Sequence, residues 1–140
     1  MADLYSSTYK TAAGFSAEMG NAWTADFEAD MAAASADVIY VGVIPAGVRV
    51  TQVRIISEDT GSTSTIDVGY APEDGTTPTA APNYWWNDLD TSGAAVAGFS
   101  SAYPVQFDKP VRVRILVNSA DFTGTPRISL QFFGEMVGAK

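Results

Sequence analysis

Residues 37–56 have the character of two β-strands joined by a tight turn: Asp37-Val38-Ile39-Tyr40-Val41-Gly42-Val43-Ile44-Pro45-Ala46-Gly47-Val48-Arg49-Val50-Thr51-Gln52-Val53-Arg54-Ile55-Ile56. β-Branched and aromatic residues dominate both runs, 37–44 and 48–56, and such residues favour strands. The segment Ile44-Pro45-Ala46-Gly47 suits a type I turn, because proline presets φ at the second position and glycine is favoured at the fourth. The pattern predicts a hairpin in which the turn sets the register.

Further short segments with strand character follow this hairpin. Residues 64–70 place Ile66, Val68 and Tyr70 in alternation with polar or small residues, as in a half-buried strand. A long irregular loop is expected from residue 71 to about 91, where prolines and glycines are frequent. Short strands are expected at 94–99, 103–107, 111–117 and 127–133. Because no convincing helix follows residue 37, the chain is predicted to be all-β, an antiparallel sandwich or barrel.

Residues 1–30 differ from the rest, and we assign them as an N-terminal arm that precedes a β-sandwich domain at 31–140. They are rich in Ala, Ser, Thr and Gly, and their large side chains recur about every four positions. Left exposed, such side chains would form an adhesive patch. Two arrangements are open: a strand and loop packed on the same chain, or an arm that lies on a neighbouring subunit. The candidate contact residues of the arm are Tyr5, Tyr9, Phe15, Trp23 and Phe27.

The composition excludes several classes of function. The chain has 140 residues, of which 46% are hydrophobic and 17% charged, so a single folded domain is expected. Its net charge of −8 opposes binding to nucleic acid or to an anionic membrane. Neither a signal peptide nor a membrane-spanning segment is expected. The absence of cysteine and histidine rules out disulfides and histidine-dependent catalysis, and we expect no metal and no other cofactor.

The acidic residues could in principle form a catalytic or calcium-binding site, but the sequence patterns for such sites are incomplete. Asp59-Thr60-Gly61 matches an aspartic protease motif, but no buried apolar strand precedes it and no second apolar-glycine motif is present. A polar hairpin loop, in which Asp59 caps its own turn and Gly61 takes a positive φ, is preferred. The acidic residues between 59 and 108 could serve calcium or a glycosidase, yet they form no regular calcium-binding loop. We therefore expect a solvated acidic face and no enzymatic activity.

Two further clusters could support an interface. Tyr84, Trp85 and Trp86 lie in the expected long loop, where they could anchor a protein contact, stack on sugar rings, or close an end of the core. Arg112 and Arg114 share one face of a strand. They could form a basic strip for an acidic partner, although a solvated sheet face that discourages aggregation is the more ordinary arrangement.

The segment 38–50, a strand followed by an Ile-Pro-Ala-Gly turn and a second strand, resembles one found in the capsid decoration, or cement, proteins of tailed bacteriophages. The continuation at 61–70, the length, the lack of Cys and His, the low charge and the Ala-rich N-terminal arm are similar too. The resemblance implies a jelly-roll-like subunit without enzymatic activity, present as a homodimer or homotrimer. It also implies a location in the virion, on the outer capsid surface, after synthesis in the cytoplasm of the bacterial host.

Under this resemblance, the protein bridges neighbouring subunits of the major capsid protein and stabilises the shell. The arm and the Tyr84-Trp85-Trp86 cluster would supply contacts to the capsid or to sister subunits. Two alternatives stay open: a phage tail or fibre module of similar composition, and a carbohydrate-binding module that uses the aromatic cluster.

Overall fold

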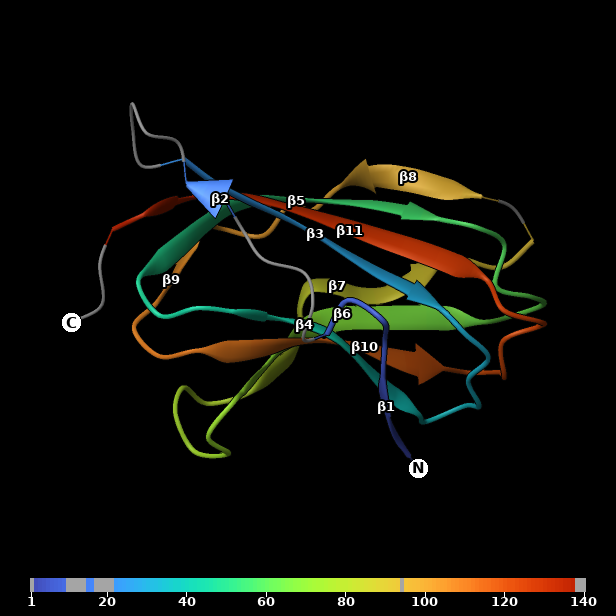
Figure 1. Ribbon diagram of the computed structural model, residues 1–140. Coiled ribbons are helices and arrows are strands. Elements are labelled where there is room, and N and C mark those ends of the chain that lie inside the picture. The colour runs from blue at the N-terminus through green and yellow to red at the C-terminus, as the bar shows by residue number, and fades with distance from the viewer. Residues whose placement is uncertain (1, 10–14, 17–21, 94, 138–140) are drawn as a thin grey trace.

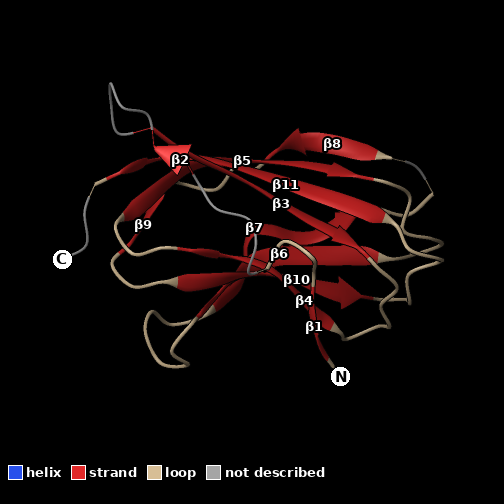
Figure 2. Ribbon diagram, in the orientation of Figure 1, coloured by secondary structure: helices blue, strands red, loops and turns tan. Residues whose placement is uncertain are grey.

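The computed structural model is a sandwich of two β-sheets (Figures 1 and 2). It describes residues 2–9, 15–16, 22–93 and 95–137, and this part of the chain contains strands and loops but no helix. Sheet A consists, in spatial order, of β1 (Asp3–Tyr5), β4 (Val38–Ile44), β10 (Val111–Asn118), β6 (Thr65–Pro72) and β7 (Ala81–Asp90). Sheet B consists of β2 (Phe15–Ser16), β3 (Ala22–Asp30), β11 (Arg127–Met136), β5 (Val48–Ser57) and β8 (Val96–Phe99), with β9 (Val105–Phe107) also paired to β5.

The chain passes repeatedly from one sheet to the other, from β3 to β4, to β5, to β6, and later from β9 to β10 and β11. Among the described strands, β1 and β4 form the one parallel pair and the other pairings are antiparallel. This jelly-roll-like arrangement confirms the predicted all-β sandwich. The strands expected from residues 64, 94, 103, 111 and 127 onward are confirmed as β6 and β8 to β11.

The hairpin expected over residues 37–56 is wrong, because β4 and β5 lie in different sheets. The turn itself is present, with Gly47 at a φ of 89°. However, the Gly47 amide donates to the carbonyl of Phe107 (2.7 Å) instead of closing the turn onto Ile44. The chain crosses the sandwich at this turn, and the apolar sides of the two strands then face one another across the core.

The long loop expected up to residue 91 contains a strand. β7 covers ten residues and pairs with β6 in a ladder interrupted by two register shifts. It is the outer strand of sheet A, where Pro82 is tolerated because an edge strand leaves one row of backbone groups unpaired. The strand propensity of Tyr84, Trp85 and Trp86 outweighs the tendency of the neighbouring prolines and glycines to form a loop.

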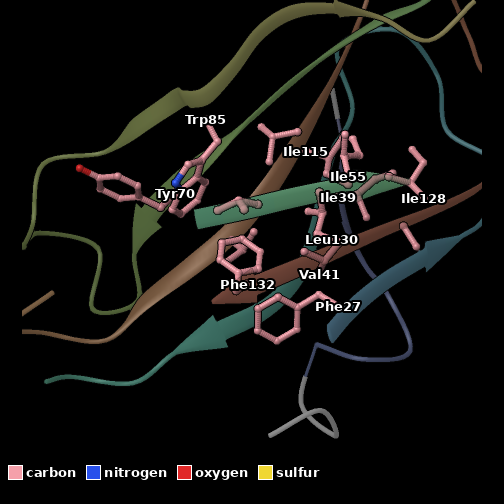
Figure 3. Packing of buried hydrophobic residues seen from close by; sticks show 14 of the residues in the cluster. Phe27, Ile39, Val41, Ile55, Tyr70, Trp85, Ile115, Ile128, Leu130 and Phe132 are labelled. Atoms are coloured by element: carbon pink, nitrogen blue, oxygen red, sulfur yellow. The ribbon is translucent and has the colours of Figure 1, made fainter. Parts of the chain in front are cut away.

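Side chains from both sheets meet in a continuous hydrophobic core (Figure 3). The ring centroid of Phe132 lies 5.4 Å from that of Phe27 and 5.0 Å from that of Trp85. These rings come from β11, β3 and β7, so the core joins strands from both layers. Burial of large apolar side chains, at about 1.5–3 kcal/mol each, is the main force that holds the sheets together.

β3 belongs to the sandwich, although its residues fall in the range 1–30 assigned from the sequence to the N-terminal arm. It pairs with β11 along its nine residues, and its alternating burial places Trp23 and Phe27 inside. For residues 22–30, packing on the same chain is therefore the arrangement found.

Residues 3–9 and 15–16, here called the N-terminal clasp, extend both sheets on the same side of the sandwich. β1 adds to β4 in sheet A, and β2 adds to β3 in sheet B (Figure 1). Between them, Thr8 Oγ1 donates to the carbonyl of Val41 (2.7 Å) and accepts from the amide of Glu28 (3.0 Å). Thr8 thus links β4 to β3 across the gap between the sheets, and the clasp packs on its own chain.

Candidate functional site

The outer face of sheet A carries a cluster that we call the tyrosine–arginine patch: Tyr5, Tyr9, Tyr40, Arg112 and Arg114. The ring centroid of Tyr5 lies 4.9 Å from that of Tyr9 and 5.4 Å from that of Tyr40. The guanidinium carbon of Arg112 lies 4.2 Å from the Tyr40 centroid, in a cation–π contact. Tyr5 is 51% exposed, whereas Tyr40 is covered by its neighbours. The patch therefore presents aromatic and cationic groups together.

The patch follows from strand alternation and register. Alternate residues of β10 are buried, so Arg112 and Arg114 project from the outer face, as predicted from the sequence. Arg114 is in register with Tyr40 on β4, and cross-strand neighbours face the same side. β1 runs along the other edge of β4 with Tyr5 beside Tyr40. Partial burial raises the pKa of the Tyr9 hydroxyl, against the opposing effect of the Arg112 guanidinium.

Only some of the aromatic residues chosen from the sequence lie at a surface. Trp23 and Phe27, 3% and 1% exposed, lie in the core and not at a surface, contrary to expectation. Trp85 also lies in the core, which was one of the arrangements left open for its cluster. Each occupies an inward position of a strand, where the opposite sheet covers it. Tyr84 and Trp86 are partly buried and pack against the same core. Phe15 belongs to β2, but its side chain lies outside the described part of the structure.

A second aromatic group surrounds Tyr70. Its ring centroid lies 4.8 Å from that of Phe107 and 5.7 Å from those of Tyr84 and Trp85. The Tyr84 hydroxyl donates to the carbonyl of Tyr103 (2.8 Å), whose own ring is 86% exposed. Sequence reasoning missed Tyr103, because a single tyrosine in a short loop forms no pattern. With Trp85 buried, the sugar-stacking hypothesis loses one of its three rings.

The Asp59-Thr60-Gly61 segment is a structural loop. Asp59 Oδ1 accepts from the amides of Gly61 and Gly93, each at 2.8 Å, and Gly61 has a φ of 115°. The Thr60 hydroxyl is buried and hydrogen-bonds the hydroxyls of Ser64 and Thr91. The self-capped polar loop and the positive φ of Gly61 are confirmed, but the loop is not the expected hairpin, because β5 and β6 lie in different sheets.

In the described ranges, no group of three or more acidic side chains is placed to hold a metal ion. The same part of the chain has no helix of the length and apolarity needed to cross a bilayer.

These observations define a jelly-roll-like sandwich with a tyrosine–arginine patch on the outer face of sheet A and an exposed Tyr103 ring. Solved structures share the fold. A chain of the capsid of Ralstonia phage GP4 matches with a TM-score of 0.72 and 18% identity, over 96% of this chain and 97% of that one. A chain of the cyanophage Pam1 capsid asymmetric unit matches with a TM-score of 0.51 and 16% identity, over 91% and 95%. No family model and no curated protein matches the sequence.

Proposed function

We propose that this protein is a structural component of a bacteriophage virion. In this proposal it binds the outer surface of the capsid, bridges neighbouring subunits of the major capsid protein and stabilises the shell, without enzymatic activity. The observation that carries the proposal is the fold shared over 96% of the chain with a chain of the Ralstonia phage GP4 capsid. The resemblance of residues 38–50 to capsid decoration proteins supports it from the sequence.

The tyrosine–arginine patch is the attachment surface in this proposal. Tyrosine and arginine are enriched among the residues that dominate binding energy at protein interfaces. Tyr5 offers a half-exposed ring that is held by its contacts with Tyr9 and Tyr40, so little side-chain freedom remains to be lost on binding. Self-association into a dimer or trimer would let several such patches act together through avidity.

The experiment is co-sedimentation of the purified protein with capsid shells of its source phage that lack it. Saturable binding in many ordered copies per shell is expected, together with a higher temperature of shell disruption. Binding in only a few copies would indicate a tail or fibre module instead, and failure to bind would overturn the proposal.

Two variants test the attachment surface. Tyr5→Ser is expected to weaken shell binding, whereas Tyr103→Ser, which removes another exposed tyrosine, is expected to leave it unchanged. The reverse result would move the attachment surface to the loop that contains Tyr103.

A further inference from the structure

Arg112 and Arg114 form no ion pair with a described carboxylate, although Arg112 hydrogen-bonds the Tyr9 side chain and lies over the Tyr40 ring. The other three arginines each donate to an acceptor on a neighbouring strand: Arg49 to Glu135 (3.4 Å), Arg54 to Gln131 (3.2 Å) and Arg127 to Glu28 (2.8 Å). The ion pairs within the described ranges are those of Arg49 and Arg127, so neither arginine of the patch has a carboxylate within 4.0 Å. Among the described residues, the charge of these two guanidinium groups is therefore not balanced by a carboxylate in contact with either of them.

Both side chains are also partly withdrawn from water. The Nε atoms of Arg112 and Arg114 are buried and have no hydrogen-bond acceptor. A buried donor without an acceptor is uncommon and costs stability. Because one side of each guanidinium is already desolvated, a carboxylate that approaches the remaining edge competes with less water, and the attraction is stronger than at a fully exposed arginine.

Arg114 is partly exposed on the outer face of sheet A. It is in register with Tyr40 on one side and with Gly69 on the other, where the backbone of Ala81 and Pro82 covers the glycine. Asp67, two residues before Gly69 on β6, accepts a hydrogen bond from the amide of Asp88 (2.7 Å). No carboxylate of the described residues lies within 4.0 Å of the Arg114 guanidinium nitrogens.

We propose that Arg112 and Arg114, bordered by the ring of Tyr5, bind carboxylate side chains of an acidic segment on a partner protein. This inference rests on the proposed function, and it assigns the chemistry of the capsid surface that the patch meets. A planar guanidinium group can donate two parallel hydrogen bonds to the two oxygens of a carboxylate. A protein is the partner rather than a nucleic acid, because two guanidinium groups on this face suit one or two carboxylates but are too few for the run of phosphates that a nucleic acid presents.

The test compares Arg114→Gln with Arg54→Gln, which makes the same change of charge on the opposite sheet. The probe is a short peptide with one Glu-Glu pair, titrated at moderate ionic strength into the ¹⁵N-labelled protein, with the matching Gln-Gln peptide as the control. We expect the glutamate peptide to shift the Nε signals of Arg112 and Arg114, and Arg114→Gln to weaken its binding about tenfold. Arg54→Gln should bind as the wild type does, and Arg114→Lys should fall between, because lysine keeps the charge but lacks the planar fork.

Co-sedimentation of the same variants with the shells separates this inference from the proposed function. Loss of shell binding by Arg114→Gln alone supports both. If the protein binds the peptide through Arg114 but does not bind shells, the carboxylate site is supported and the proposed function is overturned. Equal peptide affinity of Arg114→Gln and wild type overturns the inference. Arg114-dependent self-association in sedimentation velocity, without shell binding, would identify a second copy as the partner and overturn the capsid assignment.

Discussion

The ring of Phe27 on β3 occupies the space that a side chain on Gly42 of β4 would fill. A β-carbon at position 42 would overlap the edge of this ring. The two residues belong to different sheets. Because Gly42 has no side chain, the Phe27 ring of sheet B packs directly against the backbone of β4 in sheet A. Their contact sets how closely the sheets approach beside the clasp.

Gly42→Ala is therefore expected to lower the free energy of unfolding by about 1–3 kcal/mol, the usual cost of overpacking a core. Urea denaturation measures the change. Gly98→Ala is the matched control, because a β-carbon at position 98 meets open space. If both variants unfold at the same urea concentration, the Phe27 ring moves aside without cost and the proposed constraint on sheet spacing is absent.

The sequence predicted which residues form strands better than which strands pair. The alternation around Arg112 and Arg114 correctly identified an inner and an outer face, because that information is local to one strand. The turn at Pro45-Ala46-Gly47 is equally compatible with a hairpin and with a crossing between sheets. The choice depends on a distant partner, the Phe107 carbonyl, which local residues do not reveal.

The N-terminal region shows why the candidate site was only partly predictable. A spacing of four residues separates Trp23 from Phe27, and four is also a multiple of the two-residue strand period. Ala25 and Ala29 complete the buried alternation in β3, but small side chains make it inconspicuous. The patch itself needed Tyr5 and Tyr40 to be placed side by side by a parallel pairing, which no sequence pattern indicated.

Thr8→Val tests the clasp. Valine keeps the shape of threonine but removes the hydroxyl that bonds Val41 and Glu28, so we expect the free energy of unfolding to fall by about 1–3 kcal/mol. Hydrogen exchange of the Glu28 amide should accelerate. Thr24→Val, at an exposed position of β3, is the control. Unchanged protection of the Glu28 amide would show that the clasp does not join the sheets in solution.

Trp85→Ala tests the assignment of this ring to the core. Removal of a side chain packed against Phe132, Phe107 and Tyr70 is expected to cost about 3–5 kcal/mol of stability. Calorimetry measures the fall in melting temperature, and Trp86→Ala should cause a smaller one because its ring is only partly buried. A stable Trp85→Ala variant that loses only glycan binding would restore the carbohydrate hypothesis.

Acid should weaken the attachment of β1 through Asp37. Its carboxylate accepts from the amides of Ala34 (2.9 Å) and Ala2 (3.0 Å), and these hydrogen bonds hold the pKa of the carboxyl below its usual range. The unfolded chain, with an ordinary pKa of about 3.9, takes up the proton first as the pH falls. The stabilisation is therefore present above that pH and is lost as the pH drops through the folded-state pKa.

Urea midpoints measured across the acidic range should thus fall less steeply for Asp37→Asn than for the wild type. Asp26→Asn, on the outer face of β3, removes an exposed carboxylate elsewhere and serves as the control. Parallel curves for Asp37→Asn and the wild type would contradict the assigned role of the Asp37 hydrogen bonds.

The two strands of the clasp are very short, three residues in β1 and two in β2. Each forms the outer border of its sheet, and so few free N–H and C=O groups are a poor template for another chain. This side of the sandwich consequently resists polymerisation by strand addition. Neighbouring copies of the protein can therefore lie close together on this side without exchanging strands. Any association there depends on side-chain contacts, which can be specific and reversible.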